Sequence, residues 1–152
     1  MTVYHGMTGP GWAMFSLTNG NNAVVGTISI KLYNEDVWVV DLAAATHGFG
    51  PVVYDFAMKY TTNVSCWLAS NRVQVKPEAR RVWNYYLNNR SHELDWKTVD
   101  GFHGYTDGDD DCTALNLAFR FKTQESSVVI FLPMTKQTMS ATNKFIDTVY
   151  GN

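Results

Sequence analysis

The clearest structural signals in the sequence lie in the segment Val37-Trp-Val-Val-Asp-Leu-Ala-Ala-Ala-Thr-His-Gly-Phe-Gly-Pro51. Residues 37–44 are almost continuously apolar, which is typical of a central strand that is covered on both faces. Pro51 suits the first turn of a helix, because its missing N–H would have had no partner there. Apolar side chains then recur at helical spacing over residues 51–61. The segment therefore predicts a strand, a glycine turn and a helix in direct succession.

The flanking segments extend this pattern in both directions. Residues 23–33 are rich in β-branched side chains, and Asn34-Glu35-Asp36 links them to residues 37–44 with a length suited to a hairpin. Residues 64–69 predict a further buried strand after the helix. A strand, helix and strand in this order favour a parallel pair joined by a right-handed crossover.

The rest of the chain adds weaker signals. Gly6, Gly9, Pro10 and Gly11 predict an irregular arm at the start of the sequence. The further expected elements are a short strand over 12–17, a helix over 77–89, strands over 115–122 and 128–132, and a helix over 138–150. Together they predict one α+β domain over residues 1–152, with a mixed, mostly antiparallel central sheet flanked by helices.

Composition narrows the classes of function. The net charge is −2 over 152 residues, so the chain as a whole offers no electrostatic reason to bind nucleic acid or a membrane. Cys66 and Cys112 stand far apart and form no zinc-ligand pattern or disulfide framework. No apolar run has the length of a membrane span, and residues 1–12 lack a signal-peptide pattern. We expect a protein of the cytoplasm, or of the host cytoplasm if the chain is encoded by a phage.

The glycine turn is the first candidate site. His47-Gly48-Phe49-Gly50-Pro51 lies where the predicted helix exposes unpaired N–H groups and the positive end of its dipole, which attract anions. Gly48 and Gly50 lack a Cβ, so a ligand can approach the backbone closely. A tight turn without a ligand explains the same residues equally well. The nucleotide-binding patterns GxGxxG and GxxxxGK[ST] are both absent.

The order of elements over residues 23–89 resembles the GNAT family of acetyltransferases, with residues 115–122 as a later strand. In that family a Gln/Arg-x-x-Gly-x-Gly/Ala turn holds the pyrophosphate of acetyl-CoA, and the pantetheine wedges between two splayed strands. The resemblance implies a cofactor-binding turn with Ala45 at the Gln/Arg position. The residues of the turn are Ala45, Thr46, His47, Gly48, Phe49, Gly50 and Pro51.

Residues 48–58, Asn71-Arg72 and residues 78–83 also resemble small GNAT-like proteins encoded by tailed phages. Family members often use a tyrosine of the helix over 77–89 to protonate the leaving CoA thiolate. Trp83 stands at that position here, so the resemblance points to Tyr86, one turn further on, or to Tyr85. Asp41 and His47 flank the proposed site, and Asp41 is the candidate general base for the acceptor amine. The alternatives are that Asp41 bonds the backbone, that His47 is simply exposed, and that both tyrosines pack in the core.

Two charged segments are further candidate sites. Asp107-Gly-Asp109-Asp110-Asp111 offers carboxylates to calcium, but it fails the EF-hand spacing, so a solvated acidic loop is favoured and no metal is expected. A basic stretch contains Arg72, Lys76, Arg80, Arg81 and Arg90. This stretch suits CoA phosphate, nucleic acid, an acidic partner or a solvated helix face.

Three functions follow for these residues. The first is transfer of an acetyl group from acetyl-CoA to an amine on a small molecule or a protein. The second is a non-catalytic role as a phage structural or interaction protein, with a virion or host protein as partner. The third is modification of DNA bases, which the phage resemblance and the basic stretch suggest. Fold alone does not decide between them.

Overall fold

Residues 24–63 form two strands of a hairpin, a turn and a helix. The structure, a computed structural model, describes residues 1–99, 105–106, 113–122 and 130–151. These residues fold into two compact units that share one strand and one helix. The first unit comprises 1–31, 41–57 and 129–152, and the second comprises 32–40 and 58–128. We describe each unit by itself, and a single domain over residues 1–152 stays a prediction.

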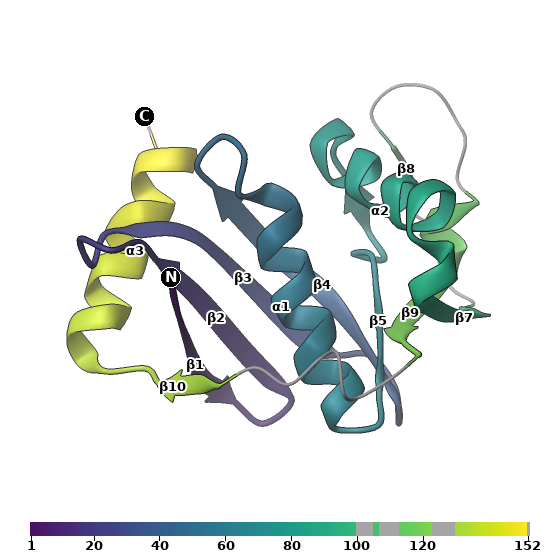
Figure 1. The fold of residues 1–152 in the computed structure, drawn as a ribbon, viewed down its shortest axis with the longest axis horizontal. Coiled ribbons are helices and arrows are strands. Elements are labelled where there is room, and N and C mark those ends of the chain that lie inside the picture. Colours follow the sequence, from purple (N-terminus) through teal and green to yellow (C-terminus); the bar gives the residue numbers. More distant parts are fainter. Residues whose placement is uncertain (100–104, 107–112, 123–129, 152) are drawn as a thin grey trace. The chain divides into compact units, whose positions relative to one another are not determined.

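The first unit is built on strands in the order β10-β1-β2-β3-β4 (Figure 1). The strands are β1 (Thr2–Gly9), β2 (Trp12–Thr18), β3 (Val24–Leu32), the second half of β4 (Val37–Ala45) and β10 (Phe131–Pro133). Neighbouring strands are antiparallel from β1 to β3, whereas β10 pairs with β1 in parallel. Pro133 is the last residue of β10, and a proline is tolerated there because β10 is the edge strand of this order.

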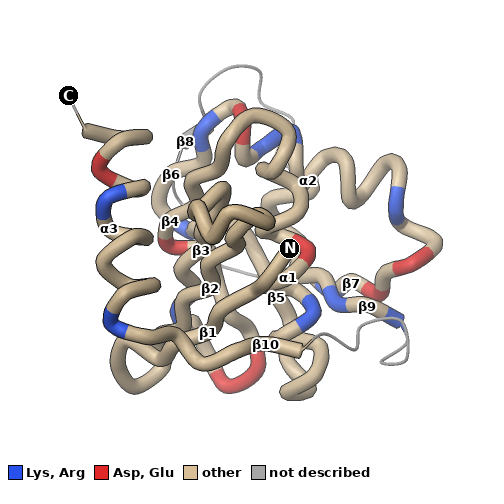
Figure 2. The backbone as a smooth tube through the Cα atoms, turned by 60° about the vertical axis from the view of Figure 1, so that its left-hand side comes forward, with Lys and Arg blue, Asp and Glu red and all other residues tan. Residues whose placement is uncertain are grey.

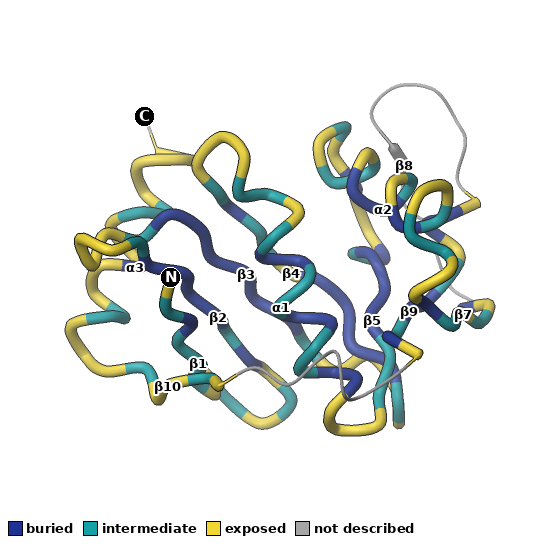
Figure 3. The backbone as a smooth tube through the Cα atoms, viewed as in Figure 1, coloured by how far each residue is buried: buried dark blue, intermediate teal, exposed yellow. Residues whose placement is uncertain are grey.

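Helices cover both faces of these strands. The first half of α1 (Gly50–Asn63) packs on one face, where Gly26 of β3 faces Val53. α3 (Lys136–Tyr150) packs on the other face, where its one buried residue, Thr142, bonds Ser16 of β2. Figure 3 shows β2 and β3 buried along most of their length, whereas α3 is largely exposed. The charged residues of α3 are few and separated along the helix (Figure 2): Lys136, Lys144 and Asp147.

The second unit has the strand order β4-β5-β9-β7. Its elements are the first half of β4, the second half of α1, β5 (Trp67–Ala69), β6 (Gln74–Val75), α2 (Pro77–Asn89), β7 (Leu94–Thr98), β8 (Tyr105–Thr106), β9 (Leu117–Phe121) and the 3₁₀ turns Ser91–Glu93 and Ala114–Asn116. β5 is parallel to β4, as predicted, and antiparallel to β9.

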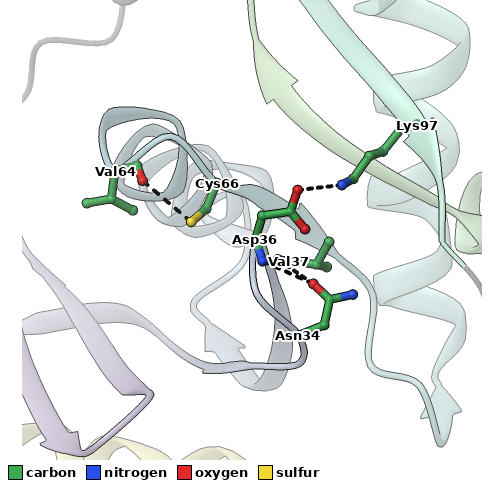
Figure 4. Close-up of polar contacts among 6 residues, drawn as sticks. All are labelled: Asn34, Asp36, Val37, Val64, Cys66 and Lys97. Carbon is green, nitrogen blue, oxygen red and sulfur yellow. Dashed lines mark hydrogen bonds and ion pairs between the residues drawn. The ribbon is translucent and has the colours of Figure 1, made fainter.

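Asn34 and Asp36 stabilise the hairpin turn between β3 and β4 through their side chains (Figure 4). The Asn34 side-chain oxygen accepts hydrogen bonds from the amides of Asp36 (3.1 Å) and Val37 (3.0 Å), which closes the turn without glycine. The Asp36 carboxylate pairs with Lys97 of β7 at 2.7 Å. A local turn is thus connected to a strand 61 residues away.

The predicted fold class is confirmed: the chain is α+β, with mixed, mostly antiparallel strands flanked by helices. The irregular arm is wrong, because residues 2–9 form β1 and Gly11, with φ of 71°, makes the turn into β2. Gly6 of β1 lies close to Met134, so this glycine permits close packing rather than breaking the strand. The strand predicted from residue 64 starts at Trp67, after a turn in which Ser65 has φ of 61°.

Two further boundaries differ from expectation. Residues 74–75 form the short strand β6, which the sequence did not predict, and the strand predicted from Leu115 begins at Leu117 after a 3₁₀ turn. The buried residues of α1 include Val53, Ala57 and Met58, which lie at helical spacing within the predicted helix.

Candidate functional site

The turn from β4 into α1 is fixed by backbone hydrogen bonds at its two ends. The Thr46 amide donates to the Val25 carbonyl of β3 at 2.8 Å, and the Phe49 amide donates back to the Thr46 carbonyl at 2.9 Å. Gly48 has φ of 92°, a conformation that residues with a Cβ rarely adopt. Glycine at this position therefore lets the chain reverse between strand and helix without backbone strain.

The amides of this turn are open. The Val53 amide bonds the Phe49 carbonyl at 3.3 Å, whereas the amides of Gly48, Gly50 and Val52 have no hydrogen-bond partner among the described residues. This is the ordinary condition of a helix start, where the first N–H groups lack an intrahelical acceptor. A Cβ added at Gly48 or Gly50 would meet no atom within 4 Å. The space beside the Cα atoms of Gly48 and Gly50 is therefore open to a ligand.

The electrostatics of the turn come from its backbone. Residues 42–54 contain no Lys, Arg, Asp or Glu. Thr46, His47, Gly48 and Pro51 are exposed, and Phe49 is half-buried. The positive end of the 14-residue helix α1 is therefore the local attraction for an anion, with no Lys or Arg in the turn itself. Ala45, at the position where the resembling family has Gln or Arg, also contributes no cationic side chain.

β4 is hydrogen-bonded to the β3 side at both of its ends. The Val37 carbonyl accepts from the Tyr33 amide at 2.8 Å and from the Asn34 amide at 3.3 Å, and the Thr46 amide donates to the Val25 carbonyl at 2.8 Å. β4 pairs with β5 only from Val37 to Val39.

Asp41, the predicted base, is exposed on β4 and engaged in an ion pair. Its carboxylate lies 3.9 Å from the ammonium group of Lys31 on β3, and both side chains are more than a third exposed. The Lys31 ammonium also lies over the Trp12 ring, 5.5 Å from the ring centre. Asp41 and the turn belong to the same unit, five residues apart from Asp41 to Thr46 along the chain.

The two predicted tyrosines belong to the second unit and differ sharply in exposure. Tyr86 is 0% exposed and packs against Trp83 and Phe119, whereas Tyr85 is 44% exposed. Trp83 is itself buried and stacks on Phe119. Of the two tyrosines, only Tyr85 presents much of its surface to solvent.

The basic stretch is not one solvated patch. Arg72 is buried and donates to the Leu115 carbonyl at 2.8 Å and the Ser70 hydroxyl at 3.2 Å, and burial lowers its pKa. Arg90 pairs with Glu93 at 2.8 Å and covers the Tyr86 ring. The hydrogen bond from Arg90 lowers the pKa of Glu93. Two of the five cations therefore serve the local fold.

A contact that the sequence analysis did not foresee lies beside the turn. The Tyr150 hydroxyl, from the end of α3, donates to the Ala43 carbonyl of β4. Burial and then the neighbouring Tyr150 phenol raise the pKa of Tyr54 on α1. No local pattern in the sequence signals this cluster, because 107 residues separate Ala43 from Tyr150.

The described residues contain no cluster of three or more His, Cys, Asp or Glu side chains able to hold a metal. The acidic loop of residues 107–111, and Cys112, lie outside the described residues. Within the described part of the chain, no helix is both long and apolar enough to cross a membrane.

Comparison with known proteins gives no sequence match, either to a family model or to a curated protein. Solved structures similar to this chain include a GNAT-family acetyltransferase from Staphylococcus aureus Mu50, with a TM-score of 0.44, 12% identity, and coverage of 74% of this chain and 69% of that one. GCN5 of Tetrahymena has a TM-score of 0.41 at 12% identity, covering 76% and 71%. A putative GNAT-family acetyltransferase from Bacteroides thetaiotaomicron has a TM-score of 0.36 at 14% identity, covering 93% and 74%. Similarity at this level assigns no family.

Proposed function

We propose that this chain binds acetyl-CoA at the turn between β4 and α1 and transfers the acetyl group to an amine. The observation that carries the proposal is the set of open amides at Gly48, Gly50 and Val52, at the positive end of a 14-residue helix. Amides at a helix start bind phosphates, and the two glycines leave space for the diphosphate to approach. Residues 45–51 are the proposed binding turn.

The transfer needs two proton movements. The carbonyl carbon of the acetyl group leaves the CoA sulfur and bonds the amine nitrogen, the amine loses a proton, and the CoA thiolate gains one. We propose Asp41 as the acceptor of the amine proton, released from Lys31 when the substrate amine replaces that ammonium group. Tyr85 is a better candidate than Tyr86 for the proton donor, because Tyr86 is enclosed by aromatic rings. Holding donor and acceptor together supplies much of the remaining rate.

The second candidate is a non-catalytic interaction protein, with a virion or host protein as partner. Its support is that the acid and base groups are engaged elsewhere: Tyr86 is fully buried and Asp41 is paired with Lys31. Trp83, at the position where the resembling family has an acid, has no proton suitable for this step. On this reading CoA binds without turnover, or not at all.

The decisive variant of the turn is Gly50→Asp, compared with Gly50→Asn. Both side chains fit, because a Cβ at Gly50 meets no atom within 4 Å, and a carboxylate at a helix start stabilises the helix. The aspartate repels a diphosphate, so titration calorimetry with acetyl-CoA should show affinity reduced at least about tenfold relative to Gly50→Asn. Equal binding by the two variants would place the ligand elsewhere.

Transfer is tested separately from binding, with acetyl-CoA labelled in the acetyl group and a set of polyamines, amino sugars and lysine peptides. Label in an amine product supports the enzyme, and its loss in Asp41→Asn supports the role of the base. If acetyl-CoA binds at the turn but no amine is labelled, the interaction protein becomes the better account.

A further inference from the structure

The edge of β4 that faces away from β3 is paired with another strand over only part of its length. Its first residues pair with β5, and this ladder ends at the pair Val39 and Ala69. β4 continues to Ala45, and no strand of the described chain pairs with this later portion on the side away from β3. The backbone groups on that side are therefore available to side chains or ligands.

The Ala43 carbonyl points to this outer side. The Ala44 carbonyl faces β3, since its oxygen lies 3.7 Å from the Cβ position of Gly26. Because successive carbonyls of a strand point in opposite directions, the carbonyl of Ala43 faces away from β3. It is this outward carbonyl that accepts the hydrogen bond of the Tyr150 hydroxyl.

Tyr150 is held at this edge by its helix rather than by burial. Its helix, α3, is anchored two turns earlier, where the buried hydroxyls of Thr142 and Ser16 lie 2.7 Å apart. The Tyr150 side chain itself is on the surface, with 53% of the residue exposed. Tyr54 of α1 lies beside it and is almost fully buried. The Tyr150 hydroxyl therefore reaches Ala43 from the exposed end of α3, whereas the anchor of the helix is buried.

We infer that Tyr150 competes with acetyl-CoA for the edge of β4 and so sets the affinity of the site for the pantetheine arm. The inference rests on the proposed function. A diphosphate at the turn directs the attached arm along β4, and Ala43 lies about 10 Å from Thr46 at the usual strand rise. Ligands with amides bind an open strand edge through its N–H and C=O groups. The arm gains the Ala43 carbonyl only when the Tyr150 hydroxyl leaves it.

Tyr150→Phe removes the competing hydroxyl and keeps the ring. We expect calorimetry to show acetyl-CoA bound about two- to tenfold more tightly, the equivalent of one hydrogen bond. ADP carries the diphosphate without the arm, so its affinity should be the same in wild type and variant. Tyr4→Phe, on β1 and three strands from β4, is the matched control and should change neither affinity.

The outcomes separate this inference from the proposed function. If the wild-type chain binds acetyl-CoA and Tyr150→Phe binds it equally or more weakly, Tyr150 is not a competitor. If Tyr150→Phe tightens ADP as much as acetyl-CoA, the hydroxyl acts on the turn and the inference is wrong. If the wild type binds neither ligand, the proposed function fails, and this inference fails with it.

Discussion

Individual glycines in this chain have different physical roles. Gly26 is required because a neighbouring side chain leaves no room for a Cβ. Gly26 on β3 faces Val53 on α1, and a Cβ at position 26 would lie 2.6 Å from a methyl group of Val53. Gly48 is required by its positive φ, and Gly50 by neither packing nor φ. Because the fold does not require glycine at position 50, substitutions there test ligand binding separately from stability.

Gly26→Ala is expected to lower the free energy of unfolding by about 1–3 kcal/mol, because α1 must shift to accommodate the methyl group. Alanine otherwise suits a strand better than glycine, so the sign of the change reports the clash. Urea denaturation measures it, with Gly20→Ala as the control, since a Cβ at position 20 meets no atom within 4 Å. Stability equal to the wild type would mean that α1 does not pack on β3 at this point.

At the scale of elements, a buried line of hydroxyls fixes α3 on the strands. Ser16 of β2 lies 2.7 Å from Thr142 and 3.3 Å from Thr27 of β3, and Thr27 donates to the Phe15 carbonyl at 2.9 Å. Thr135 caps the same helix by accepting from the Thr138 amide. The placement of α3, and therefore of Tyr150, thus includes a buried polar contact beside the half-buried apolar residues Met139, Phe145 and Ile146.

Thr142→Val keeps the shape of the side chain and removes its hydroxyl. We expect a loss of about 1–2 kcal/mol, since the Ser16 hydroxyl loses its shorter contact in a buried place. Thr148→Val, on an exposed face of the same helix, should change stability by less than about 0.5 kcal/mol. Chemical denaturation of the two variants gives the comparison, and equal effects would show that the buried network does not hold α3.

At the scale of the whole molecule, the two compact units are continuous through β4 and α1, each of which contributes residues to both. Loss of either unit removes half of a strand and half of a helix from the other. We therefore expect one cooperative unfolding transition, with tryptophan fluorescence and far-ultraviolet circular dichroism changing together. Two separated transitions would show that the units fold independently and would overturn the prediction of a single domain.

The sequence alone was sufficient for the elements whose signals are local. The apolar run of β4, the glycine turn and Pro51 predict the strand, turn and start of α1, and the helix between two buried runs predicts the parallel pair of β4 and β5. β1 was missed because its glycines indicate breaks when read locally, whereas Gly6 lies against Met134, 128 residues away. Such long-range contacts leave no periodic signal.

In the candidate site, too, the features set by local sequence could be predicted and those set by contacts between elements could not. The open amides follow from the turn itself, so the residues around Gly48 and Gly50 could be predicted. The burial of Tyr86 depends on packing against Phe119 of the distant strand β9, and the ion pair of Asp41 with Lys31 depends on the register of the β3–β4 hairpin. The contact of Tyr150 with Ala43 joins residues 107 apart, and neither residue type marks a site.

If the open amides of the turn hold the diphosphate of acetyl-CoA, they should respond to the ligand before other amides do. An amide nitrogen–proton NMR titration of the labelled chain with acetyl-CoA measures this response. We expect the resonances of Gly48, Gly50 and Val52 to shift most and to saturate together, with the affinity that calorimetry gives. Unchanged resonances at these three amides, while acetyl-CoA binds elsewhere or not at all, would contradict this prediction.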